Sequence, residues 1–178
     1  MGLRVGQKVL QCLLLLAMTV VGLAHPSAAG AERPFSAGLG FGLLELHRLR
    51  DIWGMTVETV QLLETVAEFG PRSGLGARFT GGFSLPGGPQ VSAFETALLL
   101  HFPGRDSRIY LGGGSGILCH GDSLNFTLHL AAGLKRDLQD YLTVFLDVKL
   151  LGILELSGGL LFFPSPLVQF TPGLTFYL

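Results

Sequence analysis

The chain has 178 residues, of which 48% are hydrophobic and only 14% are charged. This length supports one domain, and a low charge with a high apolar content argues against disorder. The formal net charge is −1 and the sequence has no basic run, so we expect no nucleic-acid partner. The two cysteines, Cys12 and Cys119, are too few for a disulfide framework.

The N-terminal segment has the pattern of a secretory signal. Arg4 and Lys8 precede an apolar stretch over residues 9–24, and small residues follow, with Ala29 and Ala31 in an Ala-x-Ala site. The apolar stretch is shorter than the roughly 20 residues that a membrane-spanning helix needs. We therefore predict that residues 1–31 are a cleaved signal peptide and that residues 32–178 form the mature domain.

The rest of the chain alternates between apolar and polar or small residues. In residues 124–135, for example, Leu128 and Leu130 lie on one face of an extended chain, and Thr127 and His129 lie on the other. The same period of two occurs in residues 75–85, 141–150 and 168–178. Such alternation predicts β-strands with one apolar and one polar side.

Clusters of Gly, Pro and charged residues divide the chain at regular intervals. Three of them are centred near residues 71, 104 and 137, and two more lie midway between these. Each interval has room for two strands long enough to cross a membrane at a tilt, which takes about 9–11 residues. The predicted strands are 35–46, 57–69, 75–85, 90–102, 107–119, 123–135, 140–151 and 168–178.

Two segments fit this scheme less well. Residues 57–69 also match a helix period, although their β-branched content favours a strand. Residues 152–166 are either an apolar loop that extends two strands or an additional strand. If 57–69 is helical and 153–163 is a strand, the count stays at eight, but every turn after the first changes sides.

The apolar faces are too extensive for the exterior of a water-soluble barrel. Facing them toward lipid explains the high hydropathy without long apolar runs, and a membrane requires the sheet to close on itself. We therefore predict an all-β fold, a single closed antiparallel up-and-down transmembrane β-barrel of about eight strands with a narrow, filled lumen. The expected lumen network consists of Arg78, Glu95, His129, Asp147 and Lys149, which we interpret as paired filler rather than a selectivity lining.

Three stretches carry a resemblance to a known family. They are 110–117 (YLGGGSGI), 132–138 (AGLKRDL) and 173–178 (GLTFYL). With them, residues 34–178 resemble the small eight-stranded outer-membrane β-barrel superfamily of porin-like and opacity-type surface proteins. The resemblance implies a location in the outer membrane and insertion by the cell's barrel-insertion machinery.

The resemblance also implies an assembly signal in the last strand. Phe170, Leu174, Phe176 and Leu178 occupy the alternate apolar positions of that signal. The final Leu stands where the family usually has Phe. Pro172 removes a backbone donor, which favours an edge or a bulge.

Few residues of the sequence are candidates for catalysis or metal binding. His120, Asp122 and Ser123 share one predicted turn, and the family includes lipid-A deacylases that use Ser, His and an acid, but the close His-x-Ser pairing of those enzymes is missing. The five histidines lack metal-ligand spacing, and Cys119 stands alone. We therefore expect no catalytic residue, metal or cofactor.

The expected function is that of an integral outer-membrane barrel with a structural or surface-interaction role, in contact with outer-membrane lipid. One alternative is a secreted or periplasmic lipocalin-like barrel that binds an apolar ligand in an inward apolar cavity. The other is the lipid-A-modifying enzyme. Residues 47–56, which include Trp53, and residues 152–167 are the loops long enough to carry a recognition surface.

Overall fold

The computed structural model describes residues 35–178 except 51–53, 105–106, 121–122, 158–159 and 163–165; of residues 46–58 and 155–166 it describes at most the backbone. The predicted signal peptide therefore lies outside the described residues. None of the described segments forms a helix long and apolar enough to span a bilayer. The strands are β1 (Phe35–Arg50), β2 (Gly54–Phe69), β3 (Gly74–Ser84), β4 (Val91–Phe102), β5 (Ser107–His120), β6 (Ser123–Gln139), β7 (Leu142–Ser157), β8 (Leu160–Phe162) and β9 (Pro166–Tyr177).

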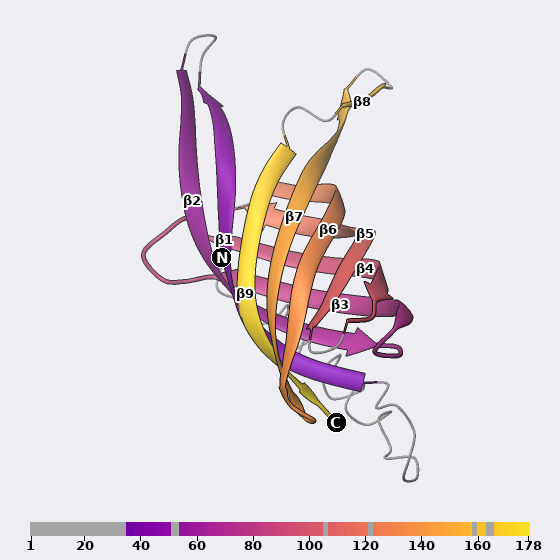
Figure 1. The fold of residues 1–178 in the computed structure, drawn as a ribbon. Coiled ribbons are helices and arrows are strands. Elements are labelled where there is room, and N and C mark those ends of the chain that lie inside the picture. Colours follow the sequence, from indigo (N-terminus) through magenta and orange to yellow (C-terminus); the bar gives the residue numbers. More distant parts are fainter. Residues whose placement is uncertain (1–34, 51–53, 105–106, 121–122, 158–159, 163–165) are drawn as a thin grey trace.

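The strands form one closed antiparallel barrel. The order in the sheet is β6-β5-β4-β3-β2-β1-β9-β7, and pairing of β6 with β7 closes it. Strand β8 has three residues and pairs only with the end of β7. Eight strands thus make the wall, as the alternating pattern predicts, and Figure 1 shows them wound around a common axis.

Both uncertain segments are resolved in favour of strands. Residues 57–69 belong to β2, which pairs with β1 along its whole length from Gly54 to Phe69. Residues 152–166 extend β7 to Ser157, add the short β8 and begin β9 at Pro166. Most residues of the predicted loops 47–56 and 152–167 therefore belong to strands, because the hairpins extend several residues beyond the closed part of the barrel (Figure 1).

The two ends of the barrel differ. The turns at 70–73 and 140–141 lie at the same end as both chain ends of the wall, where the Leu178 amide donates to the Phe35 carbonyl at 3.1 Å. We call this the turn end. At the opposite end, the loop end, the β1–β2 hairpin and the β7–β8 hairpin rise above the rest (Figure 1).

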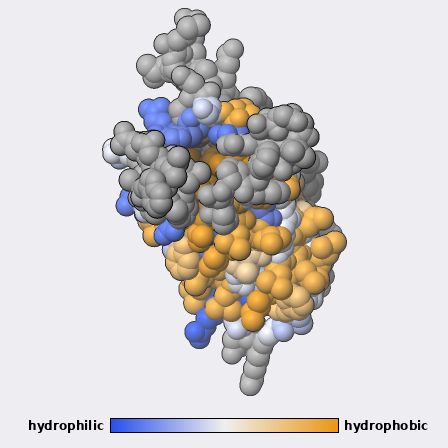
Figure 2. Space-filling model, turned by 90° about the horizontal axis from the view of Figure 1, so that it is seen from above, coloured by the Kyte–Doolittle hydropathy of each residue, from blue (hydrophilic) through white to orange (hydrophobic). Residues whose placement is uncertain are grey.

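The apolar faces of the strands point away from the barrel. Leu130 is 67% exposed, and Leu128 and Phe176 are also exposed, so these side chains do not meet in the centre. Figure 2 shows apolar residues spread broadly over the surface. This arrangement contradicts the lipocalin-like alternative, which requires apolar faces that point inward.

Pro172 lies in a strand that is paired on both sides and has no bulge, so the edge or bulge that its missing N–H favours is not found; instead it interrupts one ladder. On the β7 side it pairs with Leu146 in an unbroken register. On the β1 side the ladder stops at Gly40–Gly173 and resumes at Leu43–Phe170, without a change of register. The strand therefore keeps its alternation of faces through the gap.

Candidate functional site in the barrel interior

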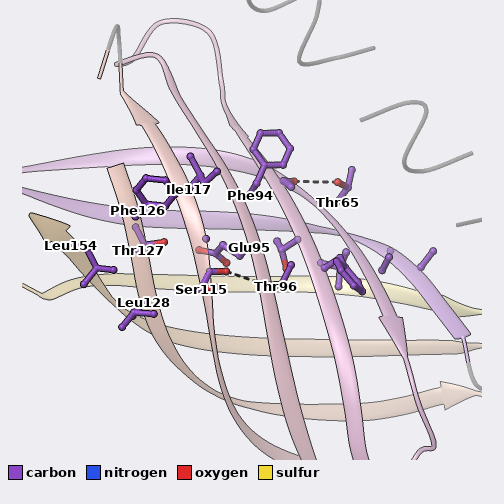
Figure 3. Close-up of a pocket in the computed structure, with 18 of the residues that line it drawn as sticks. Thr65, Phe94, Glu95, Thr96, Ser115, Ile117, Phe126, Thr127, Leu128 and Leu154 are labelled. Atoms are coloured by element: carbon purple, nitrogen blue, oxygen red, sulfur yellow. Dashed lines mark hydrogen bonds between the residues drawn. The ribbon is translucent and has the colours of Figure 1, made fainter. Parts of the chain in front are cut away.

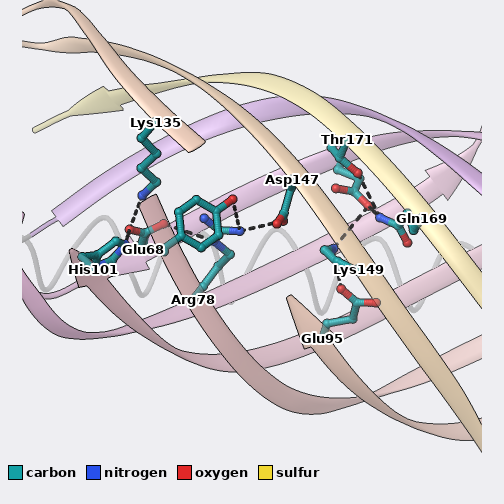
Figure 4. A network of polar contacts seen from close by, with 11 residues as sticks. Glu68, Arg78, Glu95, His101, Lys135, Asp147, Lys149, Gln169 and Thr171 are labelled. Carbon is teal, nitrogen blue, oxygen red and sulfur yellow. Dashed lines mark hydrogen bonds and ion pairs between the residues drawn. The ribbon is translucent and has the colours of Figure 1, made fainter. Parts of the chain in front are cut away.

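The five residues of the expected lumen network all point into the barrel. Arg78, Glu95, His129, Asp147 and Lys149 come from strands β3, β4, β6 and β7, and each side chain is buried. Their burial follows from the alternation, since each has outward apolar neighbours along its strand. Their contacts divide the interior polar groups into two clusters along the axis, which Figure 4 shows together.

The first cluster, the arginine cluster, centres on Arg78. Its guanidinium donates to Glu68 Oε2 at 3.1 Å, to Asp147 Oδ2 at 2.7 Å and to the Tyr110 hydroxyl at 3.2 Å. The Lys135 ammonium donates to Glu68 Oε1. These contacts join five strands, β2, β3, β5, β6 and β7, that are not all neighbours in the sheet, so they brace the barrel across its lumen.

A histidine completes the arginine cluster. His101 Nε2 lies 3.1 Å from Glu68 Oε1, yet neither ring nitrogen has the geometry of a hydrogen bond to a protein group. Tyr110 lies with its ring beneath the Arg78 guanidinium, 4.5 Å from its centroid. This stacking is a favourable cation–π geometry in a desolvated site.

The second cluster, the lysine cluster, centres on Lys149. Its ammonium donates to Glu95 Oε2 at 2.6 Å and lies 3.7 Å from Glu64 Oε1. The Gln169 amide donates to Glu64 Oε1 and, at 3.1 Å, to the Thr171 hydroxyl. Figure 4 shows Lys149 between Glu95 on one side and the Gln169–Thr171 pair on the other.

A third group closes the turn end. Asp137 accepts hydrogen bonds from Arg108 and from Thr143, both at 2.5 Å, and lies 3.8 Å from Arg72. The Arg72 guanidinium stacks on Tyr177, 4.6 Å from its ring centroid. The group thus links the turn at 70–73, the β6–β7 hairpin and the last strand, β9.

Large aromatic rings inside the barrel lie against glycines of neighbouring strands. A Cβ at Gly133 would overlap the Tyr110 ring, and a Cβ at Gly173 would overlap the Phe145 ring. At Gly40 an added Cβ would lie 3.3 Å from Phe145 Cζ. These glycines leave room for rings that fill the narrow lumen.

The lumen becomes apolar toward the loop end. The buried side chains there form one cluster of Leu44, Val60, Leu62, Val91, Ala93, Leu118, Leu151 and Leu167. On β1 and β2 the outward positions at this level, Glu45, Thr59 and Gln61, are exposed and polar. At this level β1 and β2 thus have apolar side chains inside and polar side chains outside, as in a water-soluble barrel. The sequence pattern predicted a polar lumen and did not predict this change.

The outer surface has a hollow lined by residues of β1–β7. Its lining includes small or hydroxyl-bearing outward residues, among them Thr65, Gly81, Thr96 and Ser115. The hydroxyls of Thr65 and Thr96 donate to main-chain carbonyls of the adjacent strands at 3.2 and 3.4 Å. Figure 3 shows Phe94, Ile117 and Phe126 beside them. The hollow is thus a depression in the apolar band, with no charged side chain pointing outward among its lining residues.

Of the residues weighed for catalysis, the structure describes His120 and Ser123. His120 and Ser123 pair in register at the loop end, while His101 lies near the turn end of β4. Asp122 lies outside the described residues. Among the described residues no three His, Cys, Asp or Glu side chains are grouped as they would be in a metal site.

Several members of the two clusters were not among the expected lumen residues. Glu64 and Glu68 lie in 57–69, where the competing helix period obscured which side chains share a face. Lys135, Gln169 and Thr171 do lie on the polar faces of their predicted strands, and alternation alone identifies them as inward. The contact of His101 with Glu68 depends on the registers of β2 with β3 and of β3 with β4, which the sequence pattern does not specify.

A closed sheet of eight antiparallel strands, apolar outside and polar inside, defines the chain as a small transmembrane β-barrel. Solved structures of this class match it over most of its length. Neisserial surface protein A aligns with a TM-score of 0.64 at 9% identity, covering 84% of this chain and 100% of that one. A de novo designed transmembrane β-barrel aligns with a TM-score of 0.55 at 10% identity, covering 85% and 100%.

The attachment invasion locus protein of Yersinia pestis aligns with a TM-score of 0.48 at 9% identity, covering 80% of this chain and 95% of that one. No model of a known protein family matches the sequence, and no curated protein sequence is significantly similar to it. The similarity thus concerns the fold, which is that of the small eight-stranded outer-membrane β-barrels.

Proposed function

We propose that this protein is a non-enzymatic barrel of the outer membrane with a structural or surface-interaction role, and that it does not conduct solutes. The observation that carries the proposal is the filled lumen. The turn-end group, the arginine cluster, the lysine cluster and the apolar cluster occupy successive levels of the interior. Eight strands leave an interior just wide enough for such side chains.

The outward surface supports the membrane location. Exposed Leu, Phe, Val and Ile side chains occur on the outer faces of β1–β7 and β9, and hydrocarbon is the solvent that such a surface requires. In this proposal the hairpins of the loop end face outward from the cell. The terminal strand, with Phe170, Leu174, Phe176 and Leu178 on its outer face, is the segment that the barrel-insertion machinery engages.

Two measurements on the full chain test the proposal. The membrane fraction is expected to contain a species that migrates differently on gels before and after heating, as a detergent-resistant barrel does. In planar bilayers the purified protein is expected to show no conductance above that of the lipid alone. A steady conductance from the wild-type barrel would contradict the filled-lumen function, and a water-soluble mature protein would contradict the membrane location.

The role of the apolar cluster can be tested in the same bilayers. We expect Leu44→Ser combined with Leu62→Ser to hydrate the loop-end half of the lumen, because both side chains are fully buried in it. The charged clusters below remain closed, so the double variant is expected to stay non-conducting but to lose stability. A matched outward pair, Leu39→Ser and Leu63→Ser, controls for the loss of apolar area.

A further inference from the structure

We propose that the lumen binds one univalent cation, a proton or an alkali-metal ion, at the carboxyl groups of Glu64 and Glu95 around Lys149. The inference is independent of the proposed function. It depends on the charge balance within the two clusters and on buried oxygen atoms that have no hydrogen-bond donor.

The arginine cluster is balanced. Glu68 and Asp147 carry two negative charges, and Arg78 and Lys135 carry two positive charges. The ion pairs Arg78–Glu68, Arg78–Asp147 and Lys135–Glu68 connect the four groups. At the turn end Arg108 is matched by Asp137, and Arg72, whose side chain is 32% exposed, lies at the aqueous rim.

The lysine cluster has one negative charge too many. Glu64 and Glu95 share the single ammonium of Lys149, at 3.7 and 2.6 Å. The other groups packed around Glu64 are neutral: Gln169 and Thr171 of β9, Gly42 of β1 and Gly82 of β3. Asp147 follows on β7, but the Arg78 guanidinium pairs with it.

Buried oxygen atoms in the same part of the lumen have no donor. Glu95 Oε1 and Gln169 Oε1 accept no hydrogen bond from the residues that the structure describes, and these side chains are only 5% and 1% exposed. Leaving such acceptors unpaired is destabilising, and an uncompensated buried charge is more so. A cation held by the carboxyls removes the surplus charge and supplies the missing partner.

Among the described residues, His129 is a further titratable group that faces the lysine cluster. It lies on β6, is 5% exposed, and its Nδ1 has no hydrogen-bond partner in the protein. A protonated His129 would balance the charge without a cation on the carboxyls. The experiment must therefore separate the carboxyls from the imidazole.

Glu64→Gln is the informative variant, because it removes the surplus charge and keeps the shape and the acceptor for the Gln169 amide. Its unfolding in detergent is followed by gel migration after heating, in sodium chloride or choline chloride and at pH 6 and pH 9. We expect the wild type to lose thermal stability when sodium is withdrawn or when the pH is raised. The Glu64→Gln barrel should be insensitive to that same change and no less stable at pH 6.

Infrared spectra of the carboxyl carbonyl stretch distinguish the two cations. If the cation is a proton, the wild type at pH 6 shows the band of a protonated carboxyl, and Glu64→Gln lacks it. If it is sodium, the band is absent and the stability follows sodium instead. A wild type with neither the band nor a response to sodium would overturn the proposal.

Two control variants complete the design. Glu68→Gln removes a carboxylate from the balanced cluster and is expected to be destabilised while keeping the dependence on pH or sodium of the wild type. His129→Gln is likewise expected to keep that dependence. If His129→Gln abolishes it and Glu64→Gln does not, the charge is carried by the imidazole and the proposed site is wrong.

Discussion

Lys149 of β7 donates a 2.6 Å hydrogen bond to Glu95 of β4, across the lumen from one side of the barrel to the other. Strands β5 and β6 lie between these two strands in the sheet, so the contact is a cross-brace rather than part of the wall. Both side chains are almost fully buried. Removal of one partner therefore leaves a charge without compensation in the interior.

The first prediction concerns this brace. Lys149→Met should lower the free energy of unfolding by about 3–5 kcal/mol, because Glu64 and Glu95 then lose the ammonium that they share. Urea titration of the barrel in detergent measures the change. The triple variant with Glu64→Gln and Glu95→Gln should recover much of the loss; if it is no more stable than Lys149→Met alone, the loss does not come from uncompensated charge.

The second prediction separates filler from conduction path. Asp147→Ala removes one of two carboxylates from Arg78 and should destabilise the barrel while the bilayer conductance stays at the level of bare lipid. The loss should be smaller than for Lys149→Met, since Glu68 still contacts the guanidinium. If conductance changes and the thermal stability does not, Asp147 lines a path and the filler interpretation is wrong.

The alternation of residues is a local property, and this explains how much of the structure was predictable. It predicted that Arg78 and Asp147 point inward and that the sheet closes, because the inward and outward faces of a strand can be read from that strand's own sequence. It did not identify Arg78–Glu68 or Tyr110–Gly133 as contacts, which depend on register and on the tilt of the strands. The apolar lumen around Leu62 was also missed, because a pattern with a period of two is unchanged when the two faces exchange polarity.

The third prediction tests the outward face. Leu130 lies near the middle of β6 and is 67% exposed, so Leu130→Arg should cost about 2–4 kcal/mol if hydrocarbon surrounds it. Leu138→Arg, near the turn end of the same strand, should cost at most about 1 kcal/mol. Folding into lipid vesicles, followed by urea titration, measures both. Equal small costs at the two positions would mean that water, not lipid, contacts Leu130.

The fourth prediction concerns the fit of Tyr110 against Gly133. Gly133→Ala places a methyl group where the Tyr110 ring and the Leu146 carbonyl already lie, so the ring must move and its contact with Arg78 must loosen. Overpacking of this kind costs about 1–3 kcal/mol. Gly88→Ala is the matched control, because a Cβ at Gly88 meets no atom within 4 Å.

Combining Gly133→Ala with Tyr110→Leu tests whether the ring is the cause of that loss. Leu lacks the atoms at the ring's far end, which are the ones that the methyl group would overlap, so the double variant should lose less than the sum of the two single variants. Urea titration of the four proteins gives the coupling free energy. If the losses simply add, the methyl group clashes with the Leu146 carbonyl rather than with the ring. Gly133 is then needed for the close approach of neighbouring strands and not to make room for Tyr110.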